Sequence, residues 1–239
     1  MLNNSIVFDI KDLRIAYGLI KAVDNLSLRL EQGQSLALLG LNGAGKTSTI
    51  RVLLGMMKAK GGETSVLGEP AGNVSKFAEI GYAPEEATPP EFLTGDEYLD
   101  FIGGFKIKDR AARKKEVSDL LSFFELDPHK AIRAYSKGMR RRVVLAQALI
   151  GNPALLILDE PFNGLDPILI KKLRERLEDY CKKGGSLLLS SHILAEVEKI
   201  CDHIAVIHKG VVKRFTKTSE LVQEFGNVEE AFTKLVGDN

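Results

Sequence analysis

The sequence predicts an α/β fold, with a mostly parallel sheet, an N-terminal antiparallel β portion and an inserted helical subdomain. Short apolar runs alternate with helical patterns near both ends of the chain, and Ser35–Leu39 is apolar enough for a buried parallel strand. Between about Thr94 and Gly151, by contrast, only helical patterns occur. Prolines precede this stretch and Asn152-Pro153 follows it, which indicates an insertion.

The 239 residues fit one domain with an inserted lobe better than two independent domains. We expect a single domain over residues 1–239, with a core lobe made of 1–83 and 152–239 and a helical subdomain made of 84–151. The subdomain is expected to contain helices at Gly95–Ile102, Asp109–Phe124 and Lys137–Ile150. In the core lobe we expect strands at Ile6–Ile15, Leu26–Leu30, Ala154–Leu158 and Ser186–Ser190. Helices are expected at Pro167–Lys182 and Ile193–Ile200, with two further short helices in Ser219–Val236. A hairpin turn is expected at His208–Gly210.

Composition excludes several classes of protein. Hydrophobic residues make up 44% of the chain, which is enough for a sizeable core and argues against disorder. The net charge of +1 gives no electrostatic case for binding nucleic acid. No apolar run approaches the roughly 20 residues that span a bilayer, so a membrane role would need another chain. Cys181 and Cys201 lack metal-ligand spacing and predict reduced thiols in a cytoplasmic protein.

The residues after the strand Ser35–Leu39 match the Walker A pattern in full. Gly43 and Gly45 let backbone N–H groups turn inward around phosphates, and the helix that follows directs its positive N-terminal end at the same anion. We expect Lys46 to reach the β- and γ-phosphates and the Thr47 hydroxyl to ligate Mg²⁺. The core is therefore predicted to be that of a P-loop NTPase. Its nucleotide-binding residues would be Gly40, Leu41, Asn42, Gly43, Ala44, Gly45, Lys46, Thr47 and Ser48.

A second apolar strand ends in two carboxylates, Asp159 and Glu160. A parallel strand delivers its last residues to the carboxyl edge of the sheet, where α/β folds bind ligands. Asp159 is then placed to hold Mg²⁺, and Glu160 to polarise the attacking water as a general base. The alternative, that both only solvate a strand end, is weakened by the complete Walker A pattern upstream.

Four further motifs occur in a fixed order along the chain. Tyr135-Ser136-Lys137-Gly138-Met139 resembles the signature motif of ABC ATPases, usually written LSGGQ. Asn163–Asp166 resembles the D-loop of that family, Ser190–His192 the H-loop and Gly81–Glu85 the Q-loop segment. Because the resemblance covers nearly the whole chain, the protein is identified as similar to the ATP-binding subunit of an ABC transporter, of the drug- and ion-efflux type.

The resemblance implies roles for these residues. The signature residues would face the γ-phosphate bound to the other subunit, and Ser136 would also serve as a helix N-cap. Asp166 would contact the opposite subunit, or would only cap the helix that begins at Pro167. His192 would sense the γ-phosphate. Tyr17 would stack on adenine, the alternative being an ordinary aromatic residue of an edge strand.

This sequence departs from the family pattern at two motifs. The signature has Tyr135, Lys137 and Met139 in place of Leu, Gly and Gln, but it keeps the serine and the second glycine. At the Q-loop, Glu85 replaces Gln. Its carboxylate would either join Thr47 and Asp159 at the metal site, or point to solvent or to the membrane partner. The three arginines at 140–142 are interpreted mainly as a solvated or ion-paired face, with DNA binding a poor second.

The function that the resemblance implies is ATP hydrolysis coupled to transport. ATP and Mg²⁺ would bind at the interface of a head-to-tail homodimer, or of a pair with a second ATPase subunit, and nucleic acid is not expected as a partner. An integral membrane permease would hold the protein at the inner face of the cell membrane. Export is preferred over import because the chain has no room for a long regulatory C-terminal domain. A GTPase would need a guanine-reading Asn-Lys-x-Asp motif, which this sequence lacks. An ABC ATPase of DNA repair or translation would usually carry a coiled-coil insertion or a tandem second ATPase domain, and the sequence has neither. A small-molecule kinase would not need the signature, D-loop and H-loop together.

Overall fold

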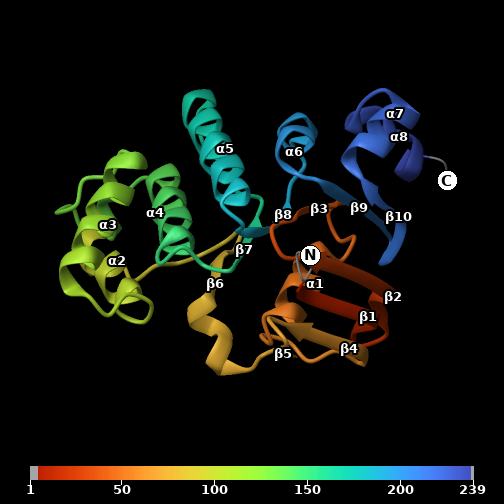
Figure 1. Cartoon of the computed structure of the whole chain (residues 1–239), viewed down its shortest axis with the longest axis horizontal. Helices are drawn as coiled ribbons and strands as arrows, with labels where there is room; N and C mark the ends of the chain where they lie inside the picture. The colour runs from red at the N-terminus through yellow and green to blue at the C-terminus, as the bar shows by residue number, and fades with distance from the viewer. Residues whose placement is uncertain (1–4, 238–239) are drawn as a thin grey trace. The chain divides into compact units, whose positions relative to one another are not determined.

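The computed structural model describes residues 5–237, which divide into two compact units (Figure 1). Unit 1 contains the chain up to Lys76 and again from Leu177 onward. Unit 2 is the intervening segment Phe77–Arg176. Unit 2 therefore includes two strands in addition to residues 84–151, and the division into a core lobe and a helical subdomain stays a prediction.

The first sheet of unit 1 is antiparallel, with the order β2-β1-β4-β5. Its strands are β1 (Ile6–Tyr17), β2 (Ile20–Glu31), β4 (Gly61–Val66) and β5 (Glu69–Pro70). Strand β2 buries every second residue in its later half, Leu26, Leu28 and Leu30, as its alternating sequence predicts. Sequence analysis did not anticipate β4, because Gly-Gly-Glu-Thr-Ser-Val carries no apolar alternation.

The second set of strands in unit 1 is mostly parallel. Strand β3 (Ser35–Leu39) pairs in parallel with β8 (Ser186–Ser190) and with β9 (His203–His208), and β10 (Val211–Lys217) closes an antiparallel hairpin on β9. Every residue of β3 and of β8 is buried, as expected of a strand covered on both faces. The helices of this unit are α1 (Lys46–Leu53), α6 (Leu194–Ile200), α7 (Thr218–Phe225) and α8 (Val228–Gly237).

Unit 2 combines a parallel strand pair with a helical cluster. Strands β6 (Ile80–Ala83) and β7 (Leu155–Asp159) pair in parallel, and α2 (Gly95–Gly104), α3 (Arg110–Phe123) and α4 (Lys137–Leu149) pack together, with α4 against β6. Two short 3₁₀ turns, η1 (Val74–Glu79) and η2 (Ile132–Ala134), and helix α5 (Pro167–Lys182) complete the described elements.

Local capping explains where the helices of unit 2 begin. Thr94 and Glu97 form a capping box at α2, since each side chain accepts a hydrogen bond from the backbone N–H of the other residue. Asp109 caps α3 and Ser136 caps α4. The predicted fold class is therefore confirmed: an antiparallel portion, a mostly parallel portion and inserted helices. Within residues 5–237, no helix is both long and apolar enough to cross a membrane.

The close approach of β6 to α4 generates a testable prediction at Gly81. A Cβ atom there would collide with the backbone oxygen of Ala148 and would lie 2.9 Å from Cγ of Pro153. Gly81→Ala should therefore lower the free energy of unfolding by about 1–3 kcal/mol.

The matched control is Gly104→Ala at the end of α2, where a Cβ would meet no atom within 4 Å. It should leave stability equal or slightly higher, because alanine is the better helix former. Urea denaturation of both variants makes the comparison. Equal stabilities would show that β6 and α4 do not pack as described.

Candidate functional site

The loop between β3 and α1 has the backbone of a phosphate cradle. Gly43 and Gly45 have φ angles of 79° and 106°, which side-chain-bearing residues rarely adopt. A Cβ at Gly45 would also lie 2.7 Å from the backbone oxygen of Ala22 and from Cγ2 of Val23. Glycine is therefore required at position 45 both by its dihedral angle and by the neighbouring strand β2.

Lys46 is held inside this loop. Its side chain is buried, and its Nζ donates a hydrogen bond of 2.7 Å to the backbone oxygen of Gly40. The helix α1 that begins here has Gly45 as its N-cap, which supplies no side-chain acceptor to the first N–H groups. A buried ammonium group beside an uncapped helix N-terminus is a site for an anion. The nine nucleotide-binding positions predicted at 40–48 thus form one loop and the first turn of α1.

Tyr17, at the end of β1, lies against the same helix. Its hydroxyl is 3.1 Å from Oγ of Ser48 and donates to Sδ of Met57 at 3.3 Å. About half of the Tyr17 side chain is exposed. The structure therefore brings Tyr17 together with the phosphate loop. The predicted sensor His192 lies two residues after the end of β8 in unit 1 and is exposed.

The acidic pair of unit 2 is buried at the end of β7. Asp159 is 1% exposed and Glu160 is 6% exposed. Glu160 has a φ angle of 51°, in the left-handed region that non-glycine residues rarely occupy. The strand thus ends abruptly at Asp159, and the next residue is fixed in a strained conformation of the kind that clusters at functional sites.

The arginine run 140–142 divides into three different environments. Arg140 pairs with Glu91 at 2.8 Å, and Arg142 pairs with Asp166 at 3.5 Å. Both agree with the interpretation of the run as an ion-paired face. For Arg141 that interpretation is wrong. Its Nη2 donates to the backbone oxygens of Asp159 at 2.7 Å and Glu160 at 2.9 Å.

The other nitrogen of the Arg141 guanidinium, Nη1, donates to the backbone oxygens of Pro84 and, at 3.3 Å, Glu85. Burial lowers the pKa of Arg141, while the carboxylates of Asp159, Glu85 and Glu160 act to raise it. Sequence reasoning missed this residue, although a signal existed. Arg141 shares helical spacing with the buried residues of α4 at positions 144, 145 and 148.

The signature-like segment begins helix α4. Oγ of Ser136 accepts a hydrogen bond of 3.2 Å from the N–H of Met139, which confirms the N-cap expected of it. Tyr135, which replaces leucine, is buried, and its hydroxyl donates to the backbone oxygen of Asp127 at 2.7 Å. Burial raises the pKa of this phenol. The tyrosine therefore acts here as a core residue of the helical cluster.

A groove of about 700 Å³ in unit 2 connects three of the predicted motifs. Its lining includes the exposed Glu85 of the Q-loop position, Lys137 and Gly138 of the signature-like segment, and Asn163 and Gly164 of the D-loop. Oδ1 of Asp166 accepts from the N–H groups of residues 168 and 169, so Asp166 caps the start of α5. These hydrogen bonds, chiefly that from Leu169, lower the pKa of Asp166.

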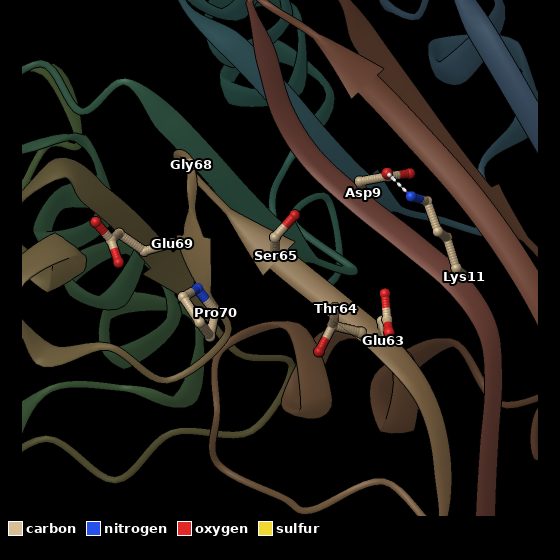
Figure 2. A pocket seen from close by; sticks show the side chains of 8 residues that line it. All are labelled: Asp9, Lys11, Glu63, Thr64, Ser65, Gly68, Glu69 and Pro70. Atoms are coloured by element: carbon tan, nitrogen blue, oxygen red, sulfur yellow. Dashed lines mark ion pairs between the residues drawn. The ribbon is translucent and has the colours of Figure 1, made fainter.

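A second hollow lies on the antiparallel sheet of unit 1 (Figure 2). It is lined by Asp9, Lys11, Glu63, Thr64, Ser65, Gly68, Glu69 and Pro70. Lys11 pairs with Asp9 at 3.3 Å, as the dashed line in Figure 2 marks. None of these residues belongs to a predicted motif, so the hollow is no part of the candidate nucleotide site.

The donor chemistry of the site fits Mg²⁺. In unit 1, Thr47 in the first turn of α1 offers a hydroxyl oxygen. In unit 2, Asp159 at the end of β7 offers a carboxylate oxygen, and both are hard donors of the kind that suits this cation. Among the described residues, no group of three or more His, Cys, Asp or Glu side chains could hold a metal ion.

In unit 1, the glycine-rich loop around the buried Lys46, followed directly by α1, has the arrangement of a P-loop. A family model described as ABC transporter matches residues 23–163, more than half of the chain. The chain belongs to the ABC transporter family, and it is an ATP-binding subunit of the ABC ATPase class.

Curated relatives agree with this membership. The ABC-type transporter ATP-binding protein EcsA of Bacillus subtilis is 36% identical over 96% of this chain and 94% of its own length. Nod factor export ATP-binding protein I of Cupriavidus metallidurans is 37% identical over 90% of this chain and 73% of its own length. An uncharacterized ABC transporter ATP-binding protein of Synechocystis is 40% identical over 88% of this chain. The matched region spans about 60% of the length of that last relative.

Solved structures share the fold. One described as the ATP-binding subunit of an ABC transporter superposes with a TM-score of 0.88, at 32% identity over 96% of this chain and 99% of that chain. A dimeric ATP-binding cassette with bound ADP and Pi superposes with a TM-score of 0.81, at 21% identity over 88% of this chain and 98% of that chain. The second likeness is one of fold alone.

The buried position of Lys46 predicts the effect of removing its charge. Lys46→Ala deletes a cation from an enclosed anion site, so ATP affinity should fall roughly tenfold or more. The exposed Lys58→Ala, in the loop after α1, is the matched control and should bind ATP normally. Titration with a fluorescent ATP analogue measures both variants, and circular dichroism checks folding. Unchanged affinity in folded Lys46→Ala would move the phosphate site elsewhere.

Proposed function

We propose that this protein hydrolyses MgATP as a head-to-tail dimer and powers export through a separate membrane subunit. The observation that carries the proposal is the loop at 40–46, where positive φ angles at Gly43 and Gly45, a buried Lys46 and an uncapped helix N-terminus coincide. Burying a charged ammonium group costs free energy, so a glycine turn without an anion to bind would not be expected to enclose one against its own backbone oxygen.

In this proposal the residues of unit 1 bind and orient the nucleotide. Lys46 exchanges its hydrogen bond with Gly40 for the β- and γ-phosphates, and the N–H groups of the loop surround them. Tyr17 stacks on adenine, with its hydroxyl anchored near Ser48. His192 donates a hydrogen bond toward the γ-phosphate and so distinguishes ATP from ADP.

The residues of unit 2 contribute the acidic groups. Glu160 accepts a proton from the attacking water, and its burial at the end of β7 keeps the carboxylate in a defined position. By the family resemblance, Asp159 and Glu85 of this unit and Thr47 of unit 1 would each offer an oxygen ligand to Mg²⁺. When bound, the cation would neutralise charge on the phosphoryl oxygens.

The signature-like residues act on the nucleotide of the partner subunit. Ser136 and Met139 form the first turn of α4, and Ser136 and Lys137 are exposed, so this helix N-terminus is accessible to a second molecule. Gly164 and Asp166 belong to the D-loop, in which Asp166 would contact the opposite subunit. Dimeric cassettes that share the fold support this arrangement.

Export through a permease is supported by the relatives. Nod factor export ATP-binding proteins of three bacteria are 36–37% identical to this chain. The proposed permease would hold the subunit at the cytoplasmic face of the membrane and would supply the substrate contacts. The permease, rather than this chain, then determines which compound is moved.

Glu160→Gln should separate ATP binding from hydrolysis. The substitution keeps the shape of the side chain but removes the base, so ATP still binds while hydrolysis falls by about 10²-fold or more. The dimer should then persist, because its trigger for opening is lost. Size-exclusion chromatography with MgATP should show a dimer for Glu160→Gln and mostly monomer for the unchanged protein.

The matched control for this experiment is Glu229→Gln on α8, which lies outside every predicted motif and should behave like the unchanged protein. Hydrolysis at the original rate in Glu160→Gln would contradict the assignment of Glu160 as general base.

A further inference from the structure

Arg141 connects three segments of unit 2 through backbone oxygens. It projects from α4, and Nη2 of its guanidinium group donates to the backbone oxygens of Asp159, the last residue of β7, and of Glu160, the next residue. The other nitrogen contacts the backbone oxygens of Pro84 and Glu85 after β6. A single side chain therefore holds the two chain segments that leave neighbouring parallel strands.

All four oxygens belong to residues that follow the last pair of the ladder between β6 and β7. Strand β6 ends at Ala83 and β7 ends at Asp159, and their ladder pairs Ala83 with Leu158 as its last residues. The guanidinium supplies charge-assisted hydrogen bonds, which are stronger than neutral ones.

The charge of Arg141 has a second effect. The carboxylates of Asp159, Glu160 and Glu85 all interact electrostatically with the guanidinium. Carboxylates gathered in one region repel each other. The guanidinium also donates to the backbone oxygen of Glu160, whose φ of 51° lies in the left-handed region.

Neither neighbouring arginine can replace it. Arg140 donates to the backbone oxygen of Arg133 and pairs with Glu91, and Arg142 pairs with Glu125 and Asp166. Lysine at 141 would be a poor substitute, because an ammonium group is a single point of charge while the planar guanidinium presents two separated pairs of donors.

We propose that Arg141 is a positioning residue for ATP hydrolysis: it sets the backbone of the general base Glu160 and of the Q-loop position Glu85 relative to each other. It acts through these two residues and does not touch the nucleotide. Because it joins the segments after β6 and β7, it transmits any displacement of the Q-loop position to the base. This inference rests on the proposed function, and its experiment separates the two.

The test compares Arg141→Gln and Arg141→Lys with Arg140→Gln, which makes the same change one position away on the same helix. For each variant, steady-state ATPase assays give kcat and KM, and titration with a fluorescent ATP analogue gives the affinity. Hydrogen exchange of the nucleotide-free protein, followed in peptides that cover 84–88 and 159–163, reports on backbone order without any turnover.

In Arg141→Gln, kcat should fall roughly tenfold or more, as expected from losing charge-assisted hydrogen bonds at the base. The affinity for the ATP analogue should change by less than about threefold, because the phosphate loop is in unit 1. Exchange should accelerate at 84–88 and 159–163. Arg141→Lys should lie between Arg141→Gln and the unchanged protein, and Arg140→Gln should match the unchanged protein in every assay.

Three results would overturn the proposal: an unchanged kcat in folded Arg141→Gln, an equal loss in Arg140→Gln, or exchange that accelerates throughout unit 2. If Arg141→Gln fails to fold, Arg141→Lys decides alone, and kcat and exchange equal to those of the unchanged protein would refute the role. If the unchanged protein shows no ATPase activity that depends on Lys46, the proposed function fails. The exchange data then decide separately whether Arg141 orders the two segments.

Discussion

The structure depends on how polar backbone groups are satisfied at the ends of buried parallel strands. Each such strand must stop, and its last oxygens leave the hydrogen-bond ladder inside the protein. After β3, the ammonium group of Lys46 donates to the backbone oxygen of Gly40. At the end of β7, the guanidinium of Arg141 donates to those of Asp159 and Glu160. In both units a cation from the following or neighbouring helix contacts the strand end, and the two strand ends carry the predicted chemistry.

The two cations differ in what they can exchange. Lys46 has a flexible stem and a single charged group, so an incoming phosphate can replace its contact with Gly40 at small cost. Arg141 donates from both terminal nitrogens, Nη1 and Nη2, to backbone oxygens and has no comparable freedom. The first arrangement suits a residue that binds and releases nucleotide at each cycle. The second suits a residue that keeps Glu160 in a fixed relation to the Q-loop position Glu85.

Much of this architecture could be predicted because it follows from local sequence. The fully buried β8 and the capped α5 occur at the predicted residues, Ser186–Ser190 and Pro167–Lys182. Strand β4 was missed because its pairing with β1 depends on tertiary context and its sequence has no apolar pattern. Arg141 was missed because a run of charges suggests a solvated face, whereas its partners are backbone oxygens that sequence does not distinguish.

The central claim is that the phosphate loop of one subunit and the signature-like helix of another complete one site. Its most direct test mixes Lys46→Ala with Ser136→Arg, each inactive alone. A mixed dimer contains one site with both changes and one site with neither, so ATPase activity should reappear on mixing. Tagged copies purified in tandem establish that mixed dimers form. Activity that stays at the level of the single variants in proven mixed dimers would contradict the claim and show that each subunit hydrolyses ATP on its own.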